Sequence, residues 1–139
     1  MGIKNVLLIV LPLISVFLGS FLTYLFQAKS RKHEAILRFK EEKYSNLIIA
    51  LQGFVGITAS GKEKKHFLEE QYKSWLYASD DVSKAINKLI KLLIENKGKE
   101  PNHEEGRKII GNIILEMRRD LLGKTKLRNE DFRYTDVLD

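Results

Sequence analysis

Cysteine is absent from this 139-residue sequence, and proline, histidine and tryptophan are rare, with two, three and one copies. Without cysteine there is no disulfide, no thiolate nucleophile and no cysteine-ligated metal. The histidines form neither a His-Glu-x-x-His nor a paired Glu-x-x-His pattern, which are spacings that hold a metal on helices. We therefore expect no metal and no other cofactor.

The sequence also lacks catalytic and phosphate-binding signatures. It has no Gly-x-Ser-x-Gly nucleophile elbow, and the glycines at Gly53 and Gly56 match neither a Walker A loop nor a dinucleotide fingerprint. Adjacent carboxylates, such as Asp80 and Asp81, occur where helices are expected to begin, a position that favours negative charge. These absences predict a protein that is not an enzyme.

Charged residues are missing from Asn5 to Ala28, and 18 of residues 1–27 are apolar. The 21 residues from Val6 to Phe26 would form a helix of about 32 Å, which matches the ~30 Å hydrocarbon core of a bilayer. The alternative is a cleaved signal peptide, which has a shorter apolar region and small residues before the cleavage point. Phenylalanine precedes the nearby candidate cleavage points, so we expect a retained transmembrane helix within residues 1–27.

The flanks of this apolar segment carry very different numbers of basic residues. The N-terminal flank contains only Lys4, whereas the other flank contains a juxtamembrane basic set of Lys29, Arg31, Lys32 and Arg38. Because lysine and arginine stay on the cytoplasmic side, we expect a single-pass inner-membrane protein with its N-terminus outside and its C-terminal domain in the cytoplasm. The same cations would attract anionic lipid headgroups.

Small residues recur along one stripe of the expected membrane helix. Ser15, Gly19 and Thr23 are spaced four residues apart, so they lie on one helix face. Such a stripe lets a second membrane helix approach closely and favours self-association, although small residues are also common in membrane helices that do not associate.

Beyond the apolar segment, apolar residues at spacings of three and four predict about four further helices. We expect the first over Lys29 to Ala59, and the others to begin near Lys62, Asp80 and His103. No proline or glycine separates the first from the membrane segment, so one continuous helix is possible. The predicted fold is all-α, with one N-terminal transmembrane helix followed by an antiparallel bundle in residues 28–123.

The helix faces follow from the same spacing. The helix beginning near Asp80 should be capped by Ser79, and the last helix should stop at Gly123. The second helix is expected to turn five residues inward: Phe67, Leu68, Tyr72, Trp75 and Leu76. The tail, residues 124–139, has no helical period, and three of its residues could pin it to the bundle: Leu127, Phe132 and Tyr134.

Two local strings are distinctive, KSWLYASDDV from Lys73 to Val82 and LEMRRDLLG from Leu115 to Gly123. With Lys126-Leu127 and Asp131-Phe132 they resemble a loose group of small, mostly uncharacterised prokaryotic proteins that have one membrane helix and a helical cytoplasmic domain. The resemblance covers about residues 30–135 and implies an architecture rather than an activity.

Six residues of these strings are candidates for interaction or structural roles: Trp75, Tyr77, Asp80, Asp81, Arg118 and Asp120. Arg118 and Asp120 are expected to pair with Asp80 or Asp81 and with a neighbouring helix. The alternative is that all four are separate solvated charges, since exposed pairs contribute only ~0–1 kcal/mol.

The functional hypothesis is a membrane-anchored protein whose helical domain binds itself or another membrane-associated protein. A more specific form of this hypothesis is an effector whose assembled spans perturb the membrane. The alternative is a membrane-tethered module that binds nucleic acid through basic helix faces, since the net charge is +6. We disfavour nucleic acid because glutamates and aspartates are interleaved with the basic residues.

Overall fold

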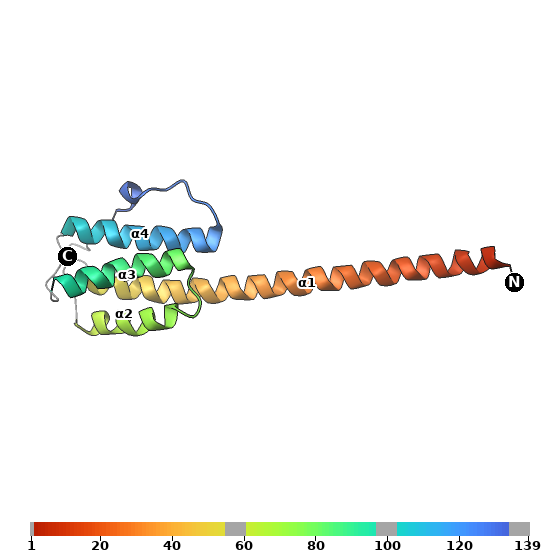
Figure 1. The fold of residues 1–139 in the computed structure, drawn as a ribbon, viewed down its shortest axis with the longest axis horizontal. Coiled ribbons are helices and arrows are strands. Elements are labelled where there is room, and N and C mark those ends of the chain that lie inside the picture. The colour runs from red at the N-terminus through yellow and green to blue at the C-terminus, as the bar shows by residue number, and fades with distance from the viewer. Residues whose placement is uncertain (1, 55–60, 97–102, 134–139) are drawn as a thin grey trace, which may run out of the picture. The chain divides into compact units, whose positions relative to one another are not determined.

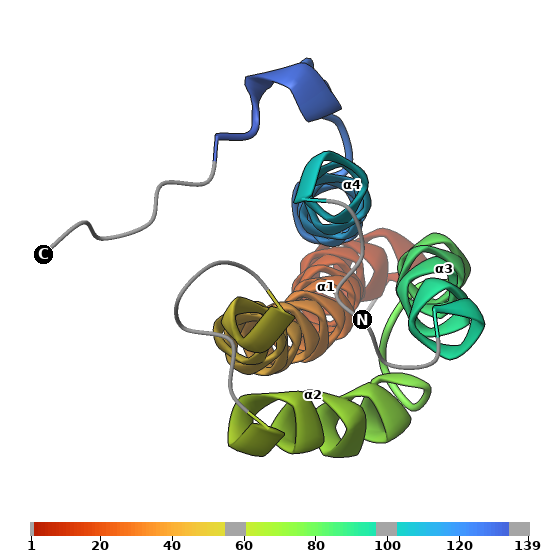
Figure 2. The same cartoon turned by 90° about the vertical axis from the view of Figure 1, so that its left-hand side faces the viewer.

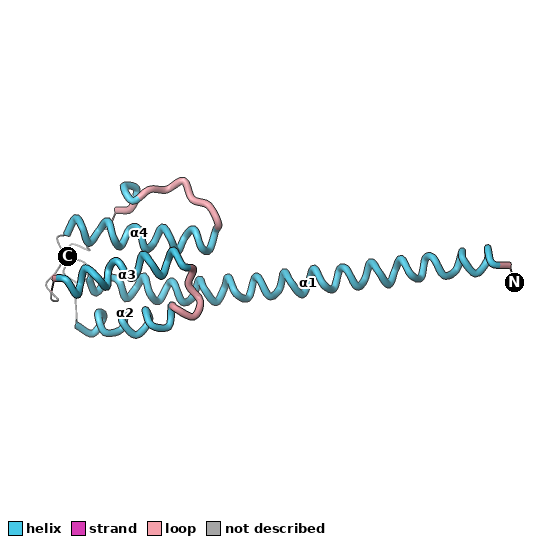
Figure 3. The backbone as a smooth tube through the Cα atoms, in the orientation of Figure 1, coloured by secondary structure: helices cyan, strands magenta, loops and turns pink. Residues whose placement is uncertain are grey.

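The computed structural model describes residues 2–54, 61–96 and 103–133, and these ranges are helical without any strand (Figures 1 and 3). The elements in chain order are α1 (Ile3–Leu51), η1 (Gln52–Phe54), α2 (Gly61–Ser74), α3 (Asp80–Glu95), α4 (His103–Leu122) and η3 (Asn129–Asp131), where η denotes a short 3₁₀ helix. The predicted all-α class is therefore confirmed.

Helix α1 contains both the apolar segment and most of the helix that was expected from Lys29. It ends at Leu51 rather than at Ala59, and residues 55–60 lie outside the described ranges. The early end coincides with a close approach between η1 and α2. A Cβ atom on Gly53 would lie 2.5 Å from the Cβ of Glu63, so a glycine is required where these segments touch.

The chain divides into two compact units, Met1–Arg38 and Phe39–Asp139. Within the described ranges, one helix is long and apolar enough to cross a membrane, and its most apolar stretch, near the N-terminus, has no buried residue. A long apolar surface of this kind is unusual for a protein in water.

The second unit has a hydrophobic core to which all four helices contribute. Around the part of α1 that begins at Phe39 lie α2, α3 and α4 (Figure 2). The fully buried members with the largest side chains are Tyr44, Leu47, Leu51, Phe67, Val82, Ile86, Leu89, Ile113 and Met117. Helices α3 and α4 each turn an apolar stripe to this core.

Two predicted helix boundaries are confirmed by the backbone. Ser79 is the N-cap of α3, and its hydroxyl accepts a hydrogen bond of 3.4 Å from the Val82 amide. Helix α4 ends at Leu122, and Gly123 follows with φ of +81°, a left-handed conformation that glycine adopts without strain.

The tail contacts α4 through one of the three predicted residues. Phe132 is partly buried, and its ring lies 3.2 Å from the position that a Cβ atom on Gly111 would occupy. Leu127 is exposed, and Tyr134 lies outside the described ranges. The small residue on α4 therefore provides the space for the Phe132 ring.

Candidate interaction surface

Helix α2 buries polar residues and exposes apolar ones. Its buried face consists of Phe67, Glu70, Gln71 and Ser74. On the opposite side lie the apolar residues Leu68 and Tyr72 of α2 and Trp75 and Leu76 of the turn that follows it, with exposed fractions of 41, 74, 59 and 89%; we call these four residues the outer face of α2. The prediction that these four side chains point inward is wrong, and only Phe67 does so.

The rotation of α2 about its axis explains the error. The Phe67 ring packs edge-on against Phe54 with a centroid distance of 5.0 Å, which fixes the face that α2 turns to the core. Successive residues of an α-helix are about 100° apart, so Leu68 and Tyr72 are turned away once Phe67 is buried. The predicted set had therefore combined residues of two faces.

The buried polar face of α2 is satisfied mainly by local contacts. The Glu70 carboxylate lies 2.6 Å from the Lys73 ammonium group, and the Ser74 hydroxyl donates a 2.6 Å hydrogen bond to the Gln71 carbonyl. Burial, together with the nearby charge of Glu70, raises the pKa of Tyr77 to about 12. The Tyr77 hydroxyl has no hydrogen-bond partner among the described residues.

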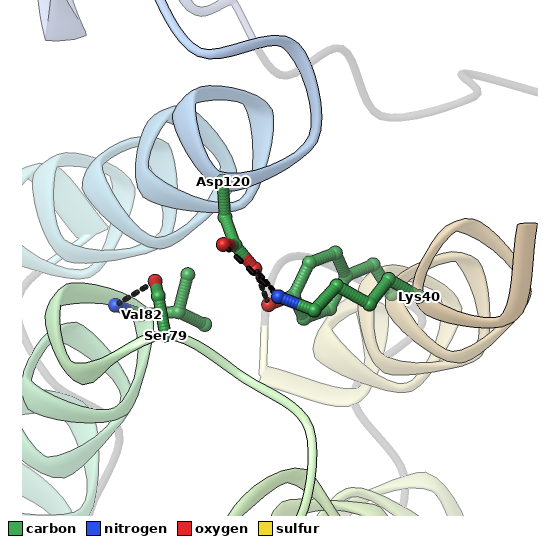
Figure 4. A network of polar contacts seen from close by, with 5 residues as sticks. Lys40, Ser79, Val82 and Asp120 are labelled. Carbon is green, nitrogen blue, oxygen red and sulfur yellow. Dashed lines mark hydrogen bonds and ion pairs between the residues drawn. The ribbon is translucent and has the colours of Figure 1, made fainter. Parts of the chain in front are cut away.

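A second polar group joins three helices, and we call it the Asp120 cluster: Lys40 and Tyr44 from α1, Ser79 from the α3 cap and Asp120 from α4. The Lys40 ammonium group lies 2.9 and 3.1 Å from the two carboxylate oxygens of Asp120, and the two side chains point toward one another (Figure 4). The Tyr44 hydroxyl donates to the same carboxylate, and the backbone of Ser79 hydrogen-bonds to that hydroxyl.

The environment of the Asp120 cluster favours the neutral form of its tyrosine. Burial first, and then the hydrogen bond and charge of Asp120, raise the pKa of Tyr44 far above its ordinary value of 10.0. Its side chain is 1% exposed, and those of Lys40 and Asp120 are 18 and 12% exposed. The cluster is therefore a structural connection between α1 and α4, largely shielded from water.

These contacts correct the expected pairing of the acidic and basic residues. Asp120 does pair with a neighbouring helix, but that helix is α1. Arg118 is exposed and makes no ion pair with Asp80 or Asp81 within the described ranges, where Asp81 lies 3.8 Å from Lys84 instead. The reason is helix rotation, because Asp120 shares the inward face of α4 with Ile113 and Met117, whereas Arg118 is on its outer side.

Sequence reasoning missed Lys40 and Tyr44 as partners of Asp120. A signal was present, because Asp120 follows Ile113 and Met117 at helical spacing and is therefore an acid on an apolar face. A partly buried carboxylate requires a hydrogen-bond donor, and Tyr44 shares a helical spacing with Leu47 and Leu51 that favours a place in the core. Which helix supplied the donor could not be read from spacing alone.

The remaining candidate residues lie on exposed surfaces. In the first unit, the hydroxyls of Ser15 and Thr23 donate to the carbonyls of Leu11 and Gly19 at 2.9 and 2.8 Å. A Cβ atom on Gly19 would meet nothing within 4 Å, so the stripe is open to a second helix. The juxtamembrane basic set, Lys29, Arg31, Lys32 and Arg38, is exposed throughout.

A groove of about 750 Å³ between α3 and α4 is lined mainly by charged residues. Its cations are mostly paired with neighbouring carboxylates, Lys84 with Asp81, Lys91 with Glu95 and Arg119 with Glu116. Such exposed pairs are typical of a solvated helix surface. The described residues contain no group of three or more potential metal ligands.

Comparisons of the chain with protein-family models, with curated proteins and with solved structures give no match.

Proposed function

We propose that the chain is a non-enzymatic, single-pass inner-membrane protein whose cytoplasmic unit is an antiparallel helical bundle that binds a protein partner. The binding surface is the outer face of α2, with Leu68, Tyr72, Trp75 and Leu76. The apolar segment anchors the protein, and the juxtamembrane basic residues retain the helical unit on the cytoplasmic side.

The observation that carries this proposal is the inverted arrangement of α2. An aromatic side chain buries about 150–250 Å² when it is covered. Tyr72 and Trp75 remain 74 and 59% exposed, whereas Glu70, Gln71 and Ser74 occupy the buried side of the same helix. A contiguous apolar surface rimmed by polar residues is characteristic of an interaction site, and tryptophan and tyrosine are enriched where partners bind most strongly.

Site-specific photocrosslinking tests the proposal. A photoreactive amino acid replaces Tyr72 in the full-length chain, and native membranes are irradiated before mass spectrometry of the adducts. We expect discrete protein adducts from this position, because the side chain would lie inside the interface.

A matched control places the same photoreactive residue at Lys88, which is exposed on α3. Adducts at position 72 should disappear when Trp75 is changed to Glu, whereas folding should be unaffected because Trp75 is outside the core. If position 72 yields only lipid adducts, or the same pattern as position 88, the outer face of α2 is not a protein-binding surface.

A further inference from the structure

The outer face of α2 has the spacing of a coiled-coil seam. Lys65, Leu68, Tyr72 and Trp75 follow one another at intervals of three, four and three residues, which are alternating a and d positions of a heptad repeat. After Ser74 the chain forms a tight turn, in which the Leu76 amide donates to the Lys73 carbonyl at 3.1 Å and the Ala78 amide donates to the Ser74 carbonyl at 2.8 Å. Trp75 is the first residue of this turn and directly follows α2, so it adds one position to the seam.

We propose that the partner of this face is a second copy of the same chain, paired in parallel along α2. This inference rests on the proposed function, because it names the occupant of the same surface. The central contacts would be made by Leu68, Tyr72 and Trp75 against their equivalents in the second copy.

The charges that flank the seam are complementary between two copies of the chain, and they favour a parallel pair of α2 helices. In the heptad, Lys64 is at a g position and Glu69 is at the e position five residues later. In a parallel pair, each g residue faces the e residue of the following heptad on its partner, so Lys64 of each copy would face Glu69 of the other. An antiparallel pair would place like edges together, lysine near lysine and glutamate near glutamate.

The two flanking side chains differ in exposure. Glu69 is exposed and forms no ion pair within the described ranges. Lys64 is partly exposed, and its ammonium group lies 5.9 Å from the centre of the Phe54 ring, which packs against Phe67 on the buried side of α2. To reach Glu69 of a second copy, the Lys64 side chain would turn away from this ring. Lys65 at an a position reduces the affinity of the seam while restricting its register.

Two heptads are too short to associate strongly by themselves. The membrane segment compensates, because two chains held by adjacent spans would meet at an effective concentration that reaches the millimolar range for short linkers. The stripe of Ser15, Gly19 and Thr23 provides a second surface for the same pairing.

Disulfide trapping tests whether the two α2 helices pair in parallel. Because the chain has no native cysteine, any disulfide must come from the introduced residue. Leu68→Cys in the full-length protein should give a covalent dimer in oxidised native membranes, because two d positions of a parallel pair meet within disulfide reach. Lys88→Cys on α3 serves as the control and should give little dimer. Equal yields from the two variants would overturn the proposal.

A charge exchange tests the pairing of Lys64 with Glu69. Glu69→Lys and Lys64→Glu should each weaken self-association in liposomes about two- to fivefold, measured by energy transfer between labelled copies, because two like-charge contacts form. Mixing the two variants should restore association, since opposite charges then meet in the mixed pair. No restoration on mixing would overturn the proposed pairing.

The two proposals fail in distinguishable ways. If the Tyr72 photocrosslinks identify a foreign protein and Leu68→Cys gives no dimer above control, the interaction surface stands and the second copy is excluded. If no protein adduct forms at position 72, both proposals are refuted.

Discussion

Replacing Asp120 by alanine should destabilise the helical unit by about 3 kcal/mol, because the carboxylate holds two donors of α1. The Tyr44 hydroxyl would lose its acceptor, at a cost of about 1–3 kcal/mol for a buried polar group. Removing one partner of a fully buried ion pair costs about 3–5 kcal/mol. The Lys40 side chain is 18% exposed, so hydration would offset most of its share.

The measurement is a urea titration of the full-length protein in a mild detergent, followed by far-ultraviolet circular dichroism. Tyr44→Phe and the double variant complete a cycle, in which we expect a coupling of about 1–2 kcal/mol between Tyr44 and Asp120. Asp81→Ala is the matched control, because its carboxylate is 76% exposed and pairs with Lys84 at 3.8 Å. A loss below about 0.5 kcal/mol for Asp120→Ala would refute the structural role of the cluster.

The free energy of unfolding should stay constant up to about pH 10 and then fall by up to ~1.4 kcal/mol per pH unit for each of Tyr44 and Tyr77, because the pKa values of both hydroxyls are raised in the folded state. Tyr44→Phe should therefore reduce the slope of unfolding free energy against pH in the alkaline range. An unchanged slope would contradict a raised pKa for Tyr44. Gly53→Ala should cost about 1–3 kcal/mol in the urea titration because its Cβ would lie 2.5 Å from that of Glu63, whereas Gly61→Ala meets nothing within 4 Å and should be tolerated. Gly19→Ile should reduce self-association in detergent by blocking close approach of two spans, and wild-type association of this variant would exclude the stripe as a contact.

Helices α3 and α4 were predictable because each carries one clean apolar stripe with a clear boundary signal. Ser79 caps α3 through its hydroxyl, and Gly123 adopts the left-handed conformation that ends α4. These signals are local, so a single sequence contains them completely. The apolar segment of α1 was predictable for the same reason, since its length and composition suffice to identify a possible membrane span.

Helix α2 and the Asp120 cluster were not predictable in detail because both depend on contacts distant in sequence. The orientation of α2 is set by Phe67 against Phe54 and by the tight contact of Gly53 with Glu63. Apolar spacing alone assigned Trp75 to the core, since the pattern cannot distinguish a core stripe from an interface stripe. Likewise, Asp120 lies 80 residues from Lys40, and no local rule connects them.

The polar inner side of α2 has a consequence for where the molecule opens first. Phe67 is the one fully buried apolar side chain that α2 contributes within the described ranges, whereas α3 contributes Val82, Ile86 and Leu89. Local opening free energy follows buried apolar contact, so α2 should detach at a lower cost than α3 or α4. A contact that covers its outer side would then do more than join two molecules, because it would supply the amide protection that α2 lacks as a solitary chain.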